Sequence, residues 1–492
     1  MRQQTRALSI STLLLTHALC CATVSAQEER LPLNVLLIAV DDLRTELGCF
    51  GVEHARTPHI DRLAAEGVLF TNHFVAVPTC GASRYALLTG RSPGRSGVRG
   101  GNQALYRGST AIRAEVQPGA QTLPELFRRS GYHTVCLGKI SHTPDGRVFA
   151  YDGQGDGRAE LPHAWDELPT PFGPWQRGWG AFFAYAEGRH REDGEQHRDL
   201  LQFVARTDEE LPDGLIAREA VRQLEALRDR GQPFFLGVGF YKPHLPFVAT
   251  QGDWEALAQV DVPPPAAPDR PDSSYWHKSG EFYGYDAPFP ETRPLAAADS
   301  LRARRAYLAC VRFVDRQVGK LLAAVDELGL GENTIVVLWG DHGWMLGESE
   351  LWGKHSPHER ALHSPLIIRA PGVSVPGLRS AALVETTDLY PTLVDLAAPS
   401  FSRTEHELDG VSLKPLLDGS ARSVRAAAVS YWGSATSVRT QTHRLIFSGE
   451  PESARDVELY AMNEGPDPLR NMAAEEPELV RQILGLLSAE QR

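Results

Sequence analysis

Short, continuous apolar runs alternate along the chain with longer stretches in which apolar residues recur at helical spacing. Continuous runs predict strands that are buried on both faces, because a strand covered on one face only alternates apolar and polar residues. Strands of this kind are typical of parallel sheets. We therefore expect parallel strands at Asn34 to Val40, His133 to Lys139, Pro233 to Phe240, Thr334 to Asp341 and Ser364 to Arg369.

The stretches between these runs carry the signals of helices. Thr57 and Pro58 have the pattern of a helix N-cap followed by proline at the first helical position, and Gly67 marks the end of that helix. Further helices are expected at Thr122 to Arg129, Asp213 to Arg230 and Leu301 to Leu328. This alternation predicts an α/β fold with an open, mostly parallel sheet and helices on both faces. Nearer the C-terminus the pattern changes to short strands, at Ala427 to Trp432 and His443 to Phe447.

The first residues have the pattern of a signal peptide, over residues 1–26. Arg2 and Arg6 precede an apolar run from Ala7 to Val24, and small residues close the segment. A membrane anchor is the alternative, but the run is short for a span and is interrupted by polar residues, so we expect no transmembrane anchor in the mature chain. Cys20 and Cys21 leave lipoprotein anchoring as a further alternative. The expected location is periplasmic or secreted.

The formal net charge is −12, and removing a leader that carries two arginines would make the chain more acidic still. Nucleic acid is therefore not an expected partner, because phosphate backbones bind basic surfaces. An anionic substrate would need a local cluster of cations. Downstream of the leader the chain has cysteines only at positions 49, 80, 136 and 310. These are too few for a disulfide framework in a chain of this length.

Polar residues suited to chemistry follow four of the predicted strands. In chain order they are Asp41-Asp42, Lys139, Tyr241-Lys242-Pro243-His244 and Asp341-His342. Ligands of open parallel sheets bind outside the carboxyl ends of the strands, so we expect these residues to meet there. Two long segments with little periodicity, residues 145–212 and 262–294, are expected to wall the pocket.

Asp41, Asp42, Asp341 and His342 form a candidate metal site. Paired carboxylates repel one another, and at a strand end they favour a bound hard cation. The alternative for such a pair is a solvated turn. Zinc prefers more nitrogen and sulfur ligands than this set offers. Calcium is therefore the predicted divalent ion, with magnesium second.

Several stretches resemble the signatures of one family. Pro78 to Gly90 (PTCGASRYALLTG) is similar to the first sulfatase signature, with its C-x-P/A-x-R core, and Gly131 to His142 (GYHTVCLGKISH) resembles the second. Asp341 to Lys354 (DHGWMLGESELWGK) and the segment 458–471, with its ELY, DP and N, extend the match. The chain thus resembles the type I sulfatases of the alkaline phosphatase superfamily from Leu33 to about Asn471, and looks most like the iduronate-2-sulfatase group.

The resemblance implies that Cys80 is converted to formylglycine (3-oxoalanine) by a formylglycine-generating enzyme. In the hydrated aldehyde one hydroxyl attacks sulfur and displaces the alcohol, and the other then expels sulfate. Position 80 is accordingly counted among the metal ligands. The alternative for an isolated match is a small buried hydrophobe. Ala82 stands where proline is commonest in the signature, which could weaken recognition by the maturing enzyme.

The same resemblance gives roles to cationic and imidazole side chains that would otherwise read as strand-end, loop or surface residues. The implied roles are the following: Arg84 holds the oxygens of the nucleophile, Lys139 binds a sulfate oxygen, His142 acts as a base on a formylglycine hydroxyl, His244 contacts the substrate and protonates the leaving alcohol, and Lys354 and Lys242 bind substrate. Together with Cys80 these residues are the predicted catalytic and substrate-binding set.

The implied fold is a large, mostly parallel mixed sheet sandwiched by helices, as in alkaline phosphatase, with a smaller C-terminal α+β domain. We expect a catalytic domain over residues 31–420 and a C-terminal subdomain over residues 421–492, with a short antiparallel sheet and a helix at Pro477 to Leu487. The implied substrate is a sulfated carbohydrate with a 2-O-sulfated uronate. A phosphoester or phosphonate-ester hydrolase of the same superfamily and a non-catalytic glycan-binding protein are the alternatives.

Overall fold

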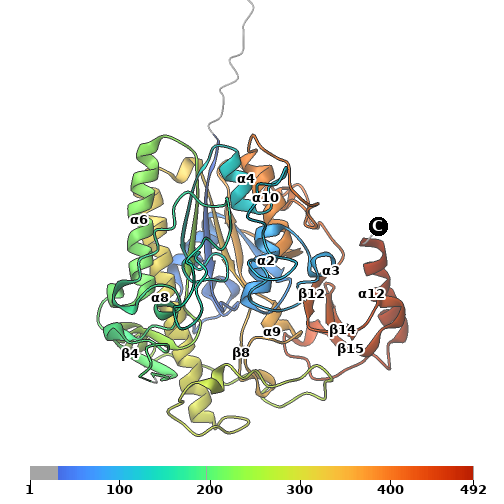
Figure 1. Ribbon diagram of the computed structural model, residues 1–492. Helices are drawn as coiled ribbons and strands as arrows, with labels where there is room; N and C mark the ends of the chain where they lie inside the picture. Colours follow the sequence, from blue (N-terminus) through green and yellow to red (C-terminus); the bar gives the residue numbers. More distant parts are fainter. Residues whose placement is uncertain (1–31, 196, 491–492) are drawn as a thin grey trace, which may run out of the picture. The chain divides into compact units, whose positions relative to one another are not determined.

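A seven-stranded sheet in the order β11-β2-β10-β7-β1-β5-β3 forms the centre of the computed structural model, which describes residues 32–195 and 197–490 (Figure 1). Its strands are β1 (Asn34–Val40), β2 (Val68–Phe74), β3 (His133–Gly138), β5 (Phe234–Phe240), β7 (Thr334–Gly340), β10 (Leu366–Arg369) and β11 (Leu378–Glu385). The predicted signal peptide, residues 1–26, lies outside the described residues.

Helices cover both faces of the sheet, as the sequence predicts (Figure 1). The side chains of β1 alternate between two cores: Leu36 and Ile38 belong to one, Val35 and Leu37 to the other. The first core includes residues of α1 (Pro58–Glu66), α6 (Pro212–Arg230) and α8 (Ala297–Glu327), and the second includes residues of α2 (Cys80–Thr89), α4 (Leu123–Arg129) and α10 (Leu389–Ala397). Burial on both faces explains why β1 is a continuous apolar run.

The direction of β10 is a correction to the sequence prediction, which made all five strands parallel. β10 pairs antiparallel with both β7 and β2. A parallel return needs a crossover that carries the chain back along the sheet, usually a long helix. The connection from β7 to β10 contains α9 (Glu359–Leu362), the two-residue strands β8 (Met345–Leu346) and β9 (Trp352–Gly353) and a short 3-10 helix at Glu348–Glu350. It has no long helix, so the chain turns back beside β7.

The continuous apolar runs used to predict strands did not include β2 and β11, which lie next to each other at one side of the sheet. Thr71 and Asn72 interrupt the apolar residues of β2 and are half-buried. β11 is the edge strand, and its first half alternates between partly buried and exposed residues. A strand that is less completely covered loses the continuous apolar pattern by which the central strands were found.

The C-terminal part forms a separate four-stranded antiparallel sheet in the order β12-β13-β14-β15. Its elements are β12 (Ala428–Trp432), β13 (Ala435–Arg439), β14 (His443–Ser448), β15 (Arg455–Ala461) and the helix α12 (Pro477–Glu490). Ile483 and Leu487 of α12 pack with Leu445, Phe447 and Leu459 of the sheet in a small core of their own. The α/β fold with a smaller C-terminal α+β part is therefore confirmed.

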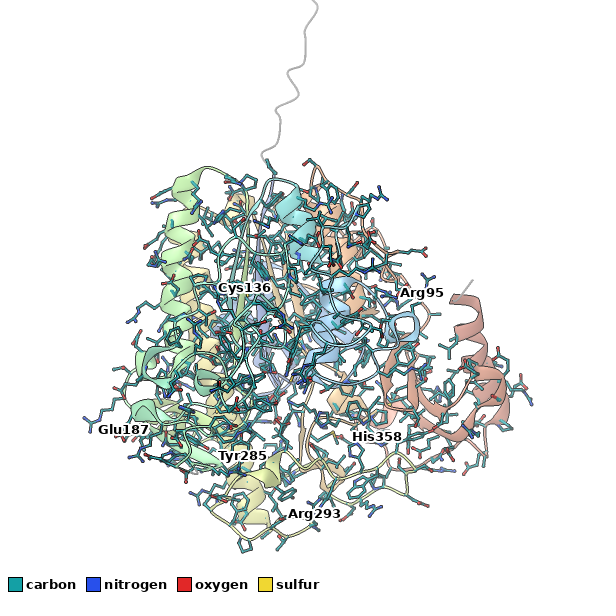
Figure 2. The ribbon with its side chains drawn as sticks, viewed as in Figure 1. Arg95, Cys136, Glu187, Tyr285, Arg293 and His358 are labelled. Atoms are coloured by element: carbon teal, nitrogen blue, oxygen red, sulfur yellow. The ribbon has the colours of Figure 1, made fainter. Side chains whose placement is uncertain are left out.

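The remaining segments between strands hold short elements only. They are α3 (Pro93–Ser96), β4 (Leu201–Ala205), β6 (Phe247–Thr250), α5 (Trp179–Phe182), α7 (Gln251–Glu255) and α11 (Lys414–Leu417). Cys136 lies among the strands of the sheet, whereas Glu187 and Arg293 lie at the periphery (Figure 2). Within the described part of the chain the four cysteines are free thiols, and none of its helices is long and apolar enough to cross a membrane.

Candidate active site

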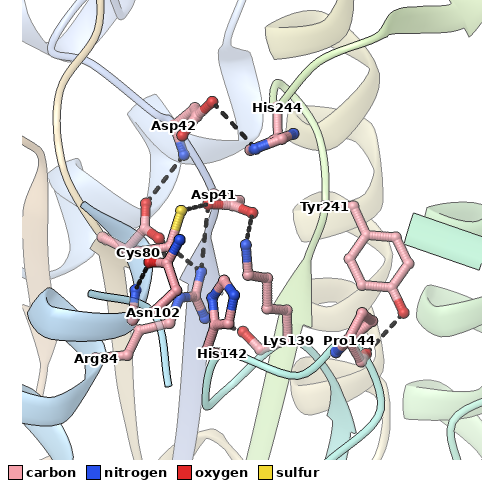
Figure 3. Close-up of polar contacts among 12 residues, drawn as sticks. Asp41, Asp42, Cys80, Arg84, Asn102, Lys139, His142, Pro144, Tyr241 and His244 are labelled. Carbon is pink, nitrogen blue, oxygen red and sulfur yellow. Dashed lines mark hydrogen bonds and ion pairs between the residues drawn. The ribbon is translucent and has the colours of Figure 1, made fainter. Parts of the chain in front are cut away.

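Four adjacent strands bring the candidate residues to one edge of the sheet. β3, β5, β1 and β7 are parallel neighbours, so their carboxyl ends meet. In that order they are followed by Lys139, by Tyr241–His244, by Asp41-Asp42 and by Asp341-His342. Figure 3 shows Asp41, Lys139 and His244 converging at this edge. Residues that are distant in sequence therefore lie together where the sequence predicted them.

Cys80 is the first residue of α2 and is buried among these strand ends. Its Sγ lies 3.4 Å from Oδ1 of Asp41, and 3.3 Å from both Nε2 of His342 and Nζ of Lys354. Gly81 lets the chain pass close to Asn102, because a Cβ at position 81 would lie 2.3 Å from Cα of Asn102. We call Asp41, Asp42, Cys80, Asp341 and His342 the Cys80 cluster.

The thiol of Cys80 is held in its protonated form. Burial, together with the neighbouring Asp41, raises the pKa of Cys80 to about 12, although Lys139 and Lys354 act in the opposite direction. The thiolate and not the thiol is the nucleophilic form of cysteine. An unmodified Cys80 is therefore a weak nucleophile at neutral pH, despite its position at the centre of the site.

The Cys80 cluster has the donor atoms of a divalent-metal site. One donor atom each from Asp41, Asp42, Cys80 and His342 lie within 4.8 Å of one another. Asp341 is adjacent: its Oδ1 accepts a hydrogen bond from the backbone N of Asp42 at 3.0 Å and lies 3.6 Å from Nε2 of His342. Oδ2 of Asp42 is buried and accepts no hydrogen bond from any described residue. A buried carboxylate oxygen without a partner fits a cation ligand.

The two neighbouring aspartates differ in charge preference. Burial opposes ionisation of Asp41, but Lys139, His244 and Arg84 outweigh it, and the pKa of Asp41 lies well below its ordinary value. Burial raises the pKa of Asp42 well above its ordinary value, with a further contribution from the negative charge of Asp41. A bound cation would remove this conflict by stabilising both carboxylates in the ionised form.

Three buried cations surround the cluster. Nζ of Lys139 lies 2.5 Å from Oδ2 of Asp41, and Nζ of Lys354 lies 2.9 Å from Oδ1 of Asp42. Nε of Arg84 donates to Oδ2 of Asp341 at 3.0 Å, and Nη2 lies at ion-pair distance, also 3.0 Å, from the same oxygen. Nη1 donates to the backbone oxygen of Lys139. Burial disfavours the charged form of both lysines, yet the adjacent carboxylates raise their pKa values above the ordinary one. The structure thus brings the three cations together, and their role in binding an anionic substrate stays a prediction.

His142 and His244 enter the site from opposite sides (Figure 3). Burial, followed by the charge of Lys139, lowers the pKa of His142 well below its ordinary value, and its Nδ1 has no hydrogen-bond partner among the described residues. The ring of His142 is therefore neutral, with Nδ1 free. Nε2 of His244 lies 3.9 Å from Oδ2 of Asp42. Burial and then Lys354 lower the pKa of His244 to about 4, while Glu281 and Asp41 act in the opposite direction.

Lys242 is placed differently from the other predicted residues. Its Nζ donates to the backbone oxygens of His244 at 2.7 Å and of Pro246 at 2.6 Å. Burial lowers its pKa, whereas carboxylates raise those of Lys139 and Lys354. In this structure Lys242 thus holds the turn that carries His244, and its direct role in substrate binding stays a prediction.

A cavity of about 440 Å³ lies beside His142. Its lining includes Gln103, Arg107, Tyr151, Gln154 and Trp179, with Asn102 and His142 on the side of the Cys80 cluster. Tyr151 and Trp179 belong to the long segment 145–212, and Glu281, from the long segment 262–294, reaches His244 and Lys354. Both long segments thus wall the site, as the sequence predicted.

Sequence reasoning missed Asn102, Trp179 and Glu281. Asn102 accepts a hydrogen bond from the backbone N of Gly81 at 2.9 Å, and so supports the residue that follows Cys80. All three residues lie in stretches without helical or strand periodicity. No local pattern could have found them, because their positions depend on how long loops fold over the sheet.

The geometry can be compared with known proteins. The family model for sulfatases matches residues 33–399. Human iduronate 2-sulfatase is 32% identical over 404 residues, which is 74% of this chain and 69% of that protein. This chain belongs to the sulfatase family. Sulfatases hydrolyse sulfuric esters and generally use formylglycine and a divalent metal, so this sulfatase is a sulfuric ester hydrolase.

Solved structures of other proteins have the same fold as this sulfatase. A phosphonate monoester hydrolase of Agrobacterium radiobacter superposes with a TM-score of 0.73 at 23% identity, over 93% of this chain and 96% of that one. A structure described as a 2-O GAG sulfatase has a TM-score of 0.65 at 23% identity, over 93% of this chain and 91% of that one.

Proposed function

We propose that this sulfatase hydrolyses a sulfate ester of a sulfated carbohydrate, specifically of a 2-O-sulfated uronate, with formylglycine at position 80 and a bound Ca²⁺. The observation that carries the proposal is the arrangement around Sγ of Cys80. Asp41, His342 and Lys354 lie within 3.4 Å of it. A nucleophile at this position would therefore touch both the carboxylate–imidazole site and the cations.

The unmodified thiol does not supply the chemistry, because the pKa of Cys80 is raised to about 12. Oxidation by a formylglycine-generating enzyme is therefore part of the proposal. Formylglycine would supply a hydroxyl nucleophile for sulfur, and calcium held by Asp41, Asp42, Asp341 and His342 would polarise that hydroxyl and offset the charge of the sulfate. The oxygen-rich donor set, with the unpartnered Oδ2 of Asp42, supports a hard cation.

The remaining side chains then have distinct tasks. Lys139 and Lys354 neutralise sulfate oxygens, and Arg84, which is fixed on Asp341, orients the nucleophile. His142 accepts a proton from the nucleophile's hydroxyl, in keeping with its neutral ring and free Nδ1. His244 protonates the leaving alcohol, because its Nε2 lies on the side of Asp42. The step requires the imidazolium form, which the lowered pKa of about 4 disfavours in the unloaded site.

The cavity beside His142 supports a sugar substrate. Trp179 and Tyr151 offer aromatic faces, with ring centroids 4.6 Å apart, and Gln103 and Gln154 offer amides for hydroxyl groups. Arg107 hydrogen-bonds Gln103 at 2.9 Å and has no carboxylate partner within ion-pair distance among the described residues. A guanidinium of this kind suits the carboxylate of a uronate or a second sulfate. Similarity to iduronate 2-sulfatase favours the 2-O position.

The signal-peptide pattern of residues 1–26 adds a location to the proposal. We infer that the protein is exported and meets polymeric substrate in the periplasm or outside the cell. Lipoprotein anchoring through Cys20 or Cys21 is the alternative form of export.

Sulfate release from two matched disaccharides tests the proposed substrate. The protein is matured by co-expression with a formylglycine-generating enzyme, and the disaccharides carry one sulfate each, at the uronate 2-position or at the hexosamine 6-position. Turnover of the first alone is the expected result. Turnover of the second alone would overturn the 2-O assignment and leave the sulfatase chemistry standing.

The superfamily alternative needs its own comparison, because the fold is shared with a phosphonate monoester hydrolase. Sulfate, phosphate and phosphonate esters of one alcohol are offered to the same preparation, and the sulfate ester is expected to have the highest kcat/KM. The non-catalytic glycan-binding alternative would be favoured by two results together. The protein would hydrolyse none of these esters, and mass spectrometry of the Cys80 peptide, from protein made in its native host, would find an intact thiol.

A further inference from the structure

The charged side chains that line the cavity beside His142 do not neutralise one another completely. Apart from the neutral His142, the charged lining residues within the described part of the chain are Arg107, Asp156 and Arg158. Nη1 of Arg158 lies 2.7 Å from Oδ2 of Asp156, so these two charges offset each other. Arg107 has no carboxylate within ion-pair distance among the described residues. The cavity therefore keeps one uncompensated positive charge.

Arg107 lies on a turn that is tied to the nucleophile segment. Oδ1 of Asn102 accepts a hydrogen bond at 2.9 Å from the backbone N of Gly81, the residue after the nucleophile. Leu105 is buried in the core that also contains residues of α2. The backbone N of Arg107 donates to the backbone oxygen of Gln103 at 2.8 Å, which closes the turn. Packing therefore fixes the place of this turn beside the helix that carries the nucleophile.

The guanidinium of Arg107 is oriented by Gln103. Nη1 of Arg107 donates to Oε1 of Gln103 at 2.9 Å, and both side chains line the cavity. Nε and Nη2 of Arg107 donate to no described residue. A guanidinium whose position is fixed and whose other N–H groups are free is suited to bind a planar carboxylate.

Aromatic rings form another wall of the same cavity. The rings of Tyr151 and Trp179 have centroids 4.6 Å apart, and Trp179 packs on His142 at 5.2 Å. The cavity volume of about 440 Å³ lies toward the lower end of the range of about 300–1,000 Å³ typical of ligand pockets. This size suits one sugar residue, so an anion bound there belongs to the sugar that carries the sulfate ester. In a 2-O-sulfated uronate that anion is the carboxylate of the same ring.

We propose that Arg107 binds the carboxylate of the sugar whose 2-O-sulfate is removed, and thereby selects a sulfated uronate over a neutral sulfated sugar. This inference rests on the proposed function. The contact changes no covalent bond, because the free N–H groups of the guanidinium only donate hydrogen bonds to the carboxylate. Lys139, Lys354 and Arg84 all contact carboxylates of the Cys80 cluster, so the sulfate and the carboxylate meet different cations.

Loss of Arg107 should matter only when the substrate carries the carboxylate. The two substrates compared are a disaccharide with a 2-O-sulfated uronate and its methyl ester, in which the carboxylate has lost its charge. Arg107→Gln should lower kcat/KM on the acid by about 10- to 100-fold, the usual worth of a hydrogen bond to a charged group. On the methyl ester the loss should be less than about threefold. The loss on the acid should appear in KM, because the contact is the same before and during the reaction.

Arg158→Gln is the matched control, because it removes the same charge from the same cavity at a residue that is already paired with Asp156. It measures the general effect of charge on an anionic substrate, and it should change the ratio of kcat/KM on the acid to that on the ester by less than about threefold. Arg107→Lys keeps the charge without the planar fork and should recover part of the rate on the acid.

Binding gives a second readout, which does not require formylglycine. Calorimetric titration of the Cys80→Ala protein in the presence of Ca²⁺ should show that it binds the acid at least about tenfold more tightly than the methyl ester. The double variant Cys80→Ala, Arg107→Gln should bind the two disaccharides equally.

Three results would overturn the inference: a wild type that does not distinguish the acid from the ester, an unchanged ratio in Arg107→Gln, or the same change of ratio in Arg107→Gln and Arg158→Gln. An unchanged ratio together with a loss on a disaccharide that carries a second sulfate would assign Arg107 to that sulfate. The proposed function fails by a different result, namely a wild type that releases sulfate from neither disaccharide. A wild type active on both, with a ratio that does not depend on Arg107, would leave the function in place and remove only the role of Arg107.

Discussion

Two buried clusters of charged side chains in this protein differ in how closely cationic nitrogens approach their carboxylate oxygens. Each cluster has a carboxylate oxygen without a hydrogen bond from a described residue, Oε2 of Glu46 in one and Oδ2 of Asp42 in the other, but their distances to the nearest cation differ. The Glu348 cluster, made of Arg44, Glu46, Arg304 and Glu348, lines a cavity of about 730 Å³ away from Cys80. Each of its four carboxylate oxygens lies within 3.2 Å of an arginine nitrogen. In the Cys80 cluster, Oδ2 of Asp42 accepts no hydrogen bond from a described residue, and its ion-pair contact with Nε2 of His244 is 3.9 Å.

The difference shows that buried charge does not by itself identify a functional site. Charges paired with one another hold segments in place, and removing one partner leaves the other uncompensated. A buried polar atom without a partner costs free energy unless something absent from the chain satisfies it. The smaller cavity adjoins the Cys80 cluster through Asn102 and His142, whereas the larger cavity is lined by the Glu348 cluster.

The largest expected effect concerns the nucleophile. Cys80→Ala should lower turnover by at least about 10⁴-fold, because loss of a nucleophile leaves only binding and electrostatic contributions. The melting temperature should stay close to that of the wild type, since alanine also fits a buried helix start. Sulfate release and a thermal melt check both parts. The control is Cys49→Ala, a cysteine outside both clusters, and substantial turnover by the Cys80 variant would contradict the mechanism.

The second prediction tests whether the unpartnered carboxylate holds a metal. Asp42→Asn should lower kcat by more than about 10²-fold, since even the outer partners of metal ligands are worth 10- to 100-fold. A chelator should lower the melting temperature of the wild type, because a ligand bound only to the folded state stabilises it. The same chelator should leave the melting temperature of the variant unchanged. Equal chelator shifts in both proteins would place the metal elsewhere.

The third prediction concerns the paired cluster. Glu348→Gln should destabilise the fold by about 3 kcal/mol, because it leaves Arg44 and Arg304 short of a buried counter-charge. Denaturant unfolding measures the change, and chelator sensitivity should stay that of the wild type. A loss of metal binding without a loss of stability would mean that the two clusters are not separate in function.

The smallest expected effect is a pH dependence within the paired cluster, because at the measured pH of 3.5 only part of the stability concerned has been lost. Burial opposes ionisation of Glu46, but Arg44, His54 and Arg304 lower its pKa from 4.5 to about 2. The unfolded chain therefore binds the proton first as pH falls, and stability of about 3 kcal/mol, present above pH 4.5, is lost between pH 4.5 and pH 2. Glu46→Gln should remove this part of the acid limb. The free energy of unfolding of the wild type and of Glu46→Gln is measured at pH 7 and pH 3.5. An equal loss of stability between these two pH values in both proteins would contradict the assignment to Glu46.

The central strands and the strand-end residues could be predicted from the sequence because their causes are local. β1 is bounded by the residues predicted for it, and Asp41 and Asp42 follow it directly. β10 was found as a strand but not in its direction, and β2 and β11 were not found at all. Strand direction and edge position depend on connections and neighbours, which a local apolar pattern does not record.

The sequence by itself determined the class of fold, the sulfatase signatures around Cys80 and the order in which the site residues occur. Those features are carried by short segments whose residue types are read one segment at a time. Only the tertiary structure decided that Oδ2 of Asp42 is unpartnered, that Lys242 holds a turn and that Glu281 lies between His244 and Lys354. Such contacts join atoms from segments far apart in the chain, so their geometry exists only once the sheet, the helices and the long loops have packed together.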